Sequence, residues 1–123
     1  MTVRIVLEDK SVEAELDDTR LGRAIWDMLP MEEHGSAWGD EIYFPLPLTP
    51  SDIETPQDVV DAGDLAYWPP GNAFCLFWGP TPASNGSEIR PASEVEVFGR
   101  VINDPAELKG TRGGVIRLEQ ITD

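Results

Sequence analysis

The segment Gly63–Pro82, GDLAYWPPGNAFCLFWGPTP, constrains the fold more than any other part of the chain. Leu65–Trp68 and Ala73–Trp78 are short apolar runs rich in aromatic residues, and residues 69–72 between them, Pro-Pro-Gly-Asn, favour a turn. The pattern predicts a tight β-hairpin. Because its strands are apolar on both faces, both faces must be covered. We therefore expect this hairpin inside a closed barrel or a sandwich, and we adopt the barrel as the working interpretation.

The N-terminal part of the chain predicts a second hairpin followed by a helix. Residues 3–16 alternate apolar and polar side chains on either side of a turn at Asp9 and Lys10. A helix is predicted at Thr19–Leu29, with Asp18 as its N-cap and Pro30 ending it. Its apolar residues recur with the spacing of one helical face: Leu21, Ala24, Ile25, Met28 and Leu29. This face must pack on the sheet or cover an open end of the barrel.

The rest of the chain predicts short strands and loops. Residues 31–50 consist of short extended pieces, with Glu41–Phe44 among them. An acidic loop is expected at 51–62, before the central hairpin, and a loop rich in Pro, Ser, Asn and Gly at 80–93, after it. Residues 94–102 alternate as a strand, with Val95, Val97 and Val101 on one face and Glu94, Glu96, Phe98 and Arg100 on the other. A short helical turn is expected at about 104–109 and a last strand at 115–121. The sum is a mainly β fold of about eight strands and one helix, in a single domain spanning residues 1–123.

The charge balance excludes some classes of partner. The chain has 9 Lys and Arg against 23 Asp and Glu, a formal net charge of −14. This charge opposes the phosphate backbone, so we expect neither a nucleic-acid partner nor an anionic membrane surface. The single cysteine, Cys75, excludes an intrachain disulfide and lies within an apolar strand. No secretory signal or membrane-spanning segment is recognisable, which predicts a cytoplasmic protein.

The motifs that support catalysis or metal binding are missing from the sequence. One histidine and one cysteine do not assemble a zinc site, and His34 lies in a polar Glu-Glu-His-Gly setting typical of an exposed residue. The glycine-rich segment 109–114 lacks the ending of a phosphate-binding loop and any following helix, so it predicts a turn. We predict no catalytic residue, no metal and no cofactor.

Two groups of residues are candidates for a binding site. Glu41 and Tyr43 alternate with apolar neighbours on one short strand, so they present an acid and a phenol on one face. Arg100 stands beside Phe98 on another strand. Outward-facing surface side chains explain both groups. The alternative is a shallow pocket in which aromatic residues supply contact area and one or two charged groups orient a ligand.

Four segments give the chain a family resemblance that covers nearly its whole length: Trp38–Phe44, Gly63–Trp68, Ala73–Pro82 and Val97–Val101. Together they resemble the small bacterial and archaeal cyclophilin-like proteins. The resemblance implies a closed or nearly closed eight-stranded barrel, shorter than a true cyclophilin, with no assigned cellular role. The strand Ala73–Trp78 is similar to the paired-phenylalanine strand of cyclophilins.

The resemblance also bears on activity. Prolyl isomerases of this fold use an arginine on a Phe-His-Arg strand, and the matching strand here, Asp40–Phe44, has none. We therefore expect a barrel that binds a small ligand or a peptide without isomerising it. The predicted ligand-binding residues are Glu41, Tyr43, Phe74, Phe77 and Arg100. The alternatives are a weak peptidyl-prolyl isomerase, in which Arg100 replaces the missing arginine, and a structural or protein-interaction module.

Overall fold

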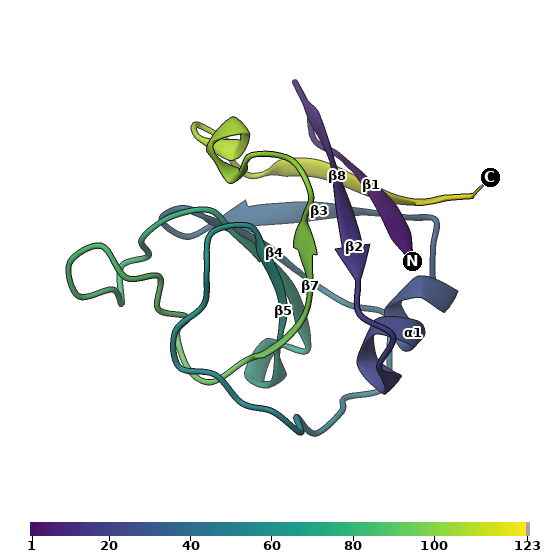
Figure 1. The fold of residues 1–123 in the computed structure, drawn as a ribbon, viewed down its shortest axis with the longest axis horizontal. Coiled ribbons are helices and arrows are strands. Elements are labelled where there is room, and N and C mark those ends of the chain that lie inside the picture. Colours follow the sequence, from purple (N-terminus) through teal and green to yellow (C-terminus); the bar gives the residue numbers. More distant parts are fainter. Residues whose placement is uncertain (123) are drawn as a thin grey trace.

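Eight strands close into a barrel in the computed structural model, which describes residues 1–122 (Figure 1). Each pair of neighbouring strands is antiparallel, in the order β1-β2-β7-β5-β6-β4-β3-β8, and β8 pairs back with β1. The strands are β1 (Thr2–Val6), β2 (Ser11–Leu16), β3 (Met31–Ala37), β4 (Glu41–Pro45), β5 (Asp64–Trp68), β6 (Ala73–Phe77), β7 (Glu96–Val101) and β8 (Gly114–Ile121). The helical elements are α1 (Arg20–Asp27) and the 3-10 turns η1 (Pro69–Gly71) and η2 (Pro105–Leu108). The predicted fold class is confirmed, including the helical turn near residues 104–109.

The central hairpin forms where it is predicted, with Trp68 paired to Ala73 across η1. Asn72 closes the turn in the left-handed conformation, with φ 48°, which asparagine tolerates better than most residues. Its side-chain nitrogen donates to the carbonyl oxygens of Leu46 at 3.2 Å and Leu48 at 2.8 Å, and its side-chain oxygen accepts from the Tyr67 hydroxyl. The turn is thereby tied to the segment that follows β4.

The barrel interior is filled by inward side chains of β1, β2 and β4 to β8, and the partly buried Met31 of β3 packs against them. Phe74 lies among the aromatic side chains, stacked on Phe44 with ring centroids 4.8 Å apart and tilted against Phe98 at 5.7 Å. Such pairs stabilise the core beyond the apolar area they bury. The interior also includes these residues: Val3, Ile5, Val12, Ala14, Leu16, Ile42, Leu65, Tyr67, Leu76, Ile116 and Leu118.

Helix α1 places Leu21 and Ile25 in the same core, so it covers one end of the barrel. The N-cap is Thr19 rather than the predicted Asp18, and the Thr19 Oγ1 atom accepts from the Gly22 amide at 3.1 Å. Asp18 is instead engaged by Arg23, whose Nε atom lies 2.5 Å from Oδ1 of Asp18. Among the described residues, no helix is long and apolar enough to cross a membrane.

The predicted face assignment of the strand at 94–102 is wrong in its second half. Leu65 of β5 pairs with Gly99 and the next residue pairs with Val97, so β7 has one extra residue, Phe98, in a β-bulge. A bulge reverses the alternation of side chains beyond it. As a result Val101 joins Phe98 in the barrel core, and Arg100 points to solvent.

The outer face of the hairpin is covered by loops. Ala66, Cys75 and Phe77 form a second apolar cluster with Val60, Ile89 and Val95, which come from the segments before β5 and before β7. Backbone hydrogen bonds join these segments, among them Val60 N to Ile89 O at 2.9 Å and Gln57 N to Val95 O at 2.8 Å. In Figure 1 the two segments extend on the side of the barrel away from the N-terminus. The hairpin is therefore covered on both faces, as predicted, with the barrel core inside and ordered loops outside.

Candidate functional site

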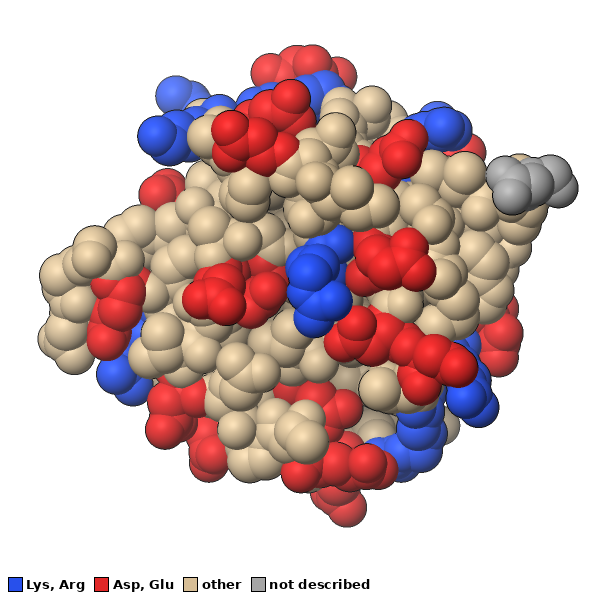
Figure 2. Space-filling view, viewed as in Figure 1, with Lys and Arg blue, Asp and Glu red and all other residues tan. Residues whose placement is uncertain are grey.

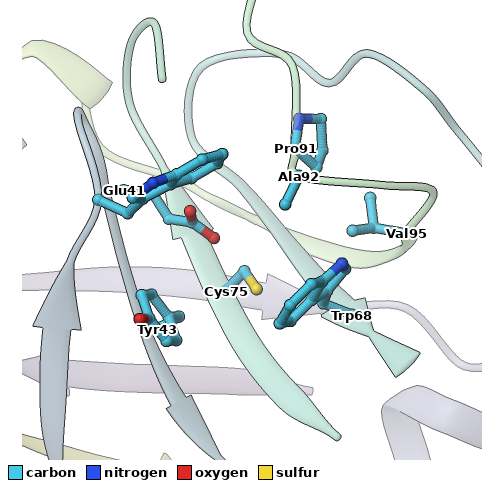
Figure 3. Close-up of a pocket in the computed structure, with 8 residues that line it drawn as sticks. Glu41, Tyr43, Trp68, Cys75, Pro91, Ala92 and Val95 are labelled. Atoms are coloured by element: carbon cyan, nitrogen blue, oxygen red, sulfur yellow. The ribbon is translucent and has the colours of Figure 1, made fainter. Parts of the chain in front are cut away.

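A pocket of about 270 Å³ opens on the outer face of the barrel, over β4, β6 and β5 (Figure 3). It lies outside the barrel core, between the sheet and residues 91–95. Its lining is mostly apolar and aromatic. The lining residues are Trp38, Glu41, Tyr43, Trp68, Cys75, Pro91, Ala92 and Val95.

The floor of the pocket follows from strand register. Ile42 and Phe44 point into the barrel, so Glu41 and Tyr43 of β4 point outward. Tyr43 pairs with Cys75 of β6, which in turn pairs with Ala66 of β5. The row across the three strands thus runs from a large residue to two small ones, and the small ones leave space above the sheet.

Two tryptophans form walls of the pocket, and hydrogen bonds hold the segments that carry or face them. The Trp38 amide donates to the Glu41 carbonyl at 3.0 Å, and the Asp40 amide donates to the Pro80 carbonyl at 3.0 Å, so the turn before β4 is anchored. On the opposite side, Nε1 of Trp68 donates to Oγ of Ser93 at 2.7 Å. This bond ties the segment 91–95 to the end of β5. The pocket is therefore built from ordered elements.

Glu41 differs from the other buried acids. Glu96 accepts the backbone amides of Glu54 and Thr55, and Asp64 accepts the amide of Asp61 at 2.9 Å. Glu41, only 5% exposed, has neither a backbone donor nor an ion-pair partner within residues 1–122. Burial in this apolar setting raises the pKa of Glu41 to about 7, an effect that interaction with the Cys75 thiol partly opposes.

Cys75 lies beside this carboxyl group, and Figure 3 shows both groups directed into the same hollow. Burial, together with the neighbouring charge of Glu41, raises the pKa of the Cys75 thiol well above its ordinary value. The thiol is therefore protonated and inert at neutral pH. In the part of the chain that the structure describes, no group of three or more His, Cys, Asp or Glu residues is placed to hold a metal ion.

The pocket offers a carboxyl group that exchanges its proton near neutral pH, in a setting of aromatic faces and aliphatic groups. Protonated, it donates a hydrogen bond, and ionised, it accepts one or balances a positive charge. Across residues 1–122, no lysine, arginine or histidine lines the pocket. The arrangement thus suits recognition of a donor or a cation far better than recognition of an anion.

The structure brings together two of the five predicted site residues, Glu41 and Tyr43. Phe74 lies inside the barrel, and Phe77 is fully buried on the outer face of β6, in the apolar cluster next to the pocket. Arg100 is exposed and forms an ion pair with Asp17, with 3.2 Å between its NH1 atom and Oδ1. Glu41 and Arg100 do not share this cavity.

Sequence reasoning missed the tryptophans, Cys75 and the segment 91–95. Cys75 had a usable signal, because it lies two residues before Phe77 on the same strand and therefore on the same face. Trp68 ends a predicted strand and Trp38 precedes one, but nothing local shows that they flank one hollow. Residues 91–95 belong to a loop that follows β6 in the chain, and nothing in the sequence shows that they lie over the pocket.

The comparisons with known proteins agree with this fold. The family model for cyclophilin-like proteins matches residues 1–119, and the chain belongs to this family. Its structure is similar to the solution structure of the hypothetical protein AF2241 from Archaeoglobus fulgidus, with a TM-score of 0.81 and 40% sequence identity. That similarity covers 98% of this chain and 95% of the archaeal protein. No curated protein was found to match the sequence.

Proposed function

We propose that this cyclophilin-like barrel binds a small molecule or a short peptide segment in the pocket on its outer face, without prolyl isomerase chemistry. The observation that supports the proposal is the buried carboxyl group of Glu41, which interacts with the Cys75 thiol but has no backbone donor or ion-pair partner within residues 1–122, in an otherwise apolar hollow. Leaving a charge or a polar group without a partner in such a site costs free energy. A ligand that partners the carboxyl group recovers part of this cost.

The shape of the pocket agrees with this role. Ligand sites are concave and mostly apolar, with a few polar groups that fix orientation. Here Glu41 and Tyr43 supply the polar groups, while Trp68, Val95 and their neighbours supply contact area. The expected partner is a small molecule or peptide, with no role for nucleic acid or membranes, and we retain the cytoplasmic location predicted from the sequence.

We infer the absence of prolyl isomerase chemistry from the lack of an arginine in the pocket. An isomerase of this fold relies on an arginine at the substrate, and the strand β4 presents Glu41 and Tyr43 to the pocket instead. Arg100, the candidate replacement, points away to Asp17. Exchange NMR on an Ala-Pro peptide tests this part. We expect no rate above the uncatalysed isomerisation, which takes tens to hundreds of seconds, and a measurable acceleration would overturn it.

Chemical-shift mapping tests the binding site. Amide signals would be followed while a library of metabolites and proline-containing peptides is added. We expect ligands that perturb Glu41, Tyr43 and Cys75 together with the segment 91–95. Perturbations confined to other surfaces, or a library without any binder, would refute the assignment, and self-association of the free protein would favour an interaction module instead.

A further inference from the structure

We propose that the pocket recognises an organic ammonium group, with the Glu41 carboxylate as its counter-ion and the aromatic side chains of Trp38, Tyr43 and Trp68 around it. This inference rests on the proposed function and adds the chemical class of the ligand. It starts from the contrast between Glu41 and the other buried acids: Asp64 and Glu96 accept backbone amides, whereas Glu41 faces a ligand-sized hollow.

The remaining residues of the pocket lining add no positive charge that would favour an anion. The indole N–H of Trp68 already donates to Ser93. Tyr43 and Cys75 are the other titratable groups in the lining within residues 1–122, and the facing segments contribute Trp38, Trp68, Pro91, Ala92 and Val95, which carry no charge. An anion would meet a carboxylate with no cation to balance it. A neutral apolar ligand would give that carboxyl group no partner beyond the Cys75 thiol.

The aromatic lining favours a cation for a second reason. The faces of tryptophan and tyrosine rings carry a negative quadrupole that attracts ammonium groups, and a site with several such rings is the usual arrangement for quaternary ammonium ligands. Three of the eight lining residues are Trp or Tyr, contributed by β4, by β5 and by the turn before β4. The carboxylate and the rings therefore select the same charge.

The charge of the whole protein acts in the same direction. The formal net charge is −14, and acidic side chains are spread widely over the face shown in Figure 2, with basic ones among them. Such a field raises the local concentration of cations and repels anions.

The size of the cavity limits how much of a ligand is enclosed. About 270 Å³ lies just below the range of sites that enclose drug-sized molecules, about 300–1,000 Å³. We therefore expect the pocket to enclose an alkylammonium head group. That group belongs either to a free small amine or to the side chain of a lysine in a peptide, and the experiment distinguishes the two.

Proton linkage provides a readout that a merely structural carboxyl group would not give. With the pKa of free Glu41 at about 7, a bound cation holds the carboxyl group ionised and lowers its pKa. Binding at pH 6 must then displace a proton that is already lost at pH 8. If the bound pKa falls well below 6, affinity drops about tenfold between pH 8 and pH 6.

The test compares choline with dimethylbutanol, its neutral carbon isostere, by NMR titration of the full chain. We expect choline to shift the signals of the pocket residues and to bind at least about tenfold more tightly than the isostere. Glu41→Gln should weaken choline about tenfold and abolish its pH dependence. Trp38→Leu keeps the lining apolar and should weaken choline but not dimethylbutanol. Glu107→Gln, which removes an exposed charge of η2 outside the pocket lining, is the matched control and should change neither.

Further titrations distinguish a free amine from a lysine side chain, and failure of the ammonium inference from failure of the proposed function. Lysine amide acetylated on its α-amino group, and the same compound trimethylated on its side-chain amine, represent a peptide ligand. Stronger binding of these than of choline assigns the site to a lysine side chain, and the reverse assigns it to a free amine. Equal binding of choline and the isostere, with no effect of Glu41→Gln, would overturn the ammonium inference while leaving the pocket as a binding site. If no probe and no library member perturbs the pocket, the proposed function fails as well. Folding of each variant is checked by its amide spectrum.

Discussion

Replacing Glu41 with glutamine should stabilise the protein at alkaline pH and leave its stability almost unchanged at acid pH. Burial raises the pKa of Glu41 from 4.5 to about 7. A pKa difference of one between the folded and unfolded states corresponds to about 1.4 kcal/mol, so the ionised carboxylate destabilises the folded protein by about 3 kcal/mol. That amount is a large fraction of the stability of a typical domain.

The sign follows from which state holds the proton. Between pH 4.5 and about 7 the folded protein keeps the proton of Glu41 while the unfolded chain has lost it. Stability from this group is therefore fully present below about pH 4.5 and is lost as the pH rises through 7. Glutamine has a similar shape and does not ionise, so the variant escapes this loss.

Urea unfolding of both proteins at several pH values between 4 and 8 measures the effect. Other groups also titrate, since burial raises the pKa of Asp64 and hydrogen bonding to the N-terminal amine lowers that of Glu15. The difference between variant and wild type cancels their contributions. This difference should increase by about 3 kcal/mol from pH 4 to pH 8. A flat line for Glu41→Gln would refute the argument that burial raises the pKa of Glu41.

Three further substitutions or reactions test other parts of the structure. Asn72→Ala removes two donations to backbone carbonyls and the acceptor of the Tyr67 hydroxyl, so it should cost about 2–4 kcal/mol in urea unfolding, and a cost below about 1 kcal/mol would contradict the assigned turn. Gly99→Ala should lower the free energy of unfolding by about 1–3 kcal/mol, because the added Cβ would lie 2.5 Å from the Glu15 carbonyl oxygen where β7 pairs with β2. An unchanged urea midpoint would contradict this close approach of β7 to β2. Cys75 should react with iodoacetamide at pH 8 at least about tenfold more slowly than free cysteine, because burial raises the pKa of its thiol, and it should recover the free rate in urea. Rapid reaction of the native protein would contradict the burial of this thiol.

Local chemistry explains which parts of the fold are predictable from the sequence. The turn at residues 69–72 and the apolar runs beside it specify a hairpin, because proline, glycine and asparagine restrict the backbone there. The helix follows from the spacing of Leu21, Ile25 and their neighbours. The sequence places its N-cap one residue early, because Asp18 and Thr19 are both good caps; in the structure Thr19 accepts from the Gly22 amide and Asp18 forms an ion pair with Arg23.

The features that escaped prediction depend on contacts between distant segments. The bulge at Phe98 changes which face Arg100 occupies, and it is visible only in the register of β7 against β5. The pocket depends on the pairing of Tyr43 with Cys75, two residues far apart in the chain, and on the segment 91–95 held over them. Alternation along β4 places Glu41 and Tyr43 on one face, but it does not reveal what stands opposite.

The carboxyl carbon resonance of Glu41, followed by NMR against pH with and without choline, tests the central claim most directly. We predict a pKa of about 7 in the free protein and a clearly lower pKa, by at least about 1, when choline is present. A free pKa near the ordinary 4.5, unmoved by choline, would contradict it.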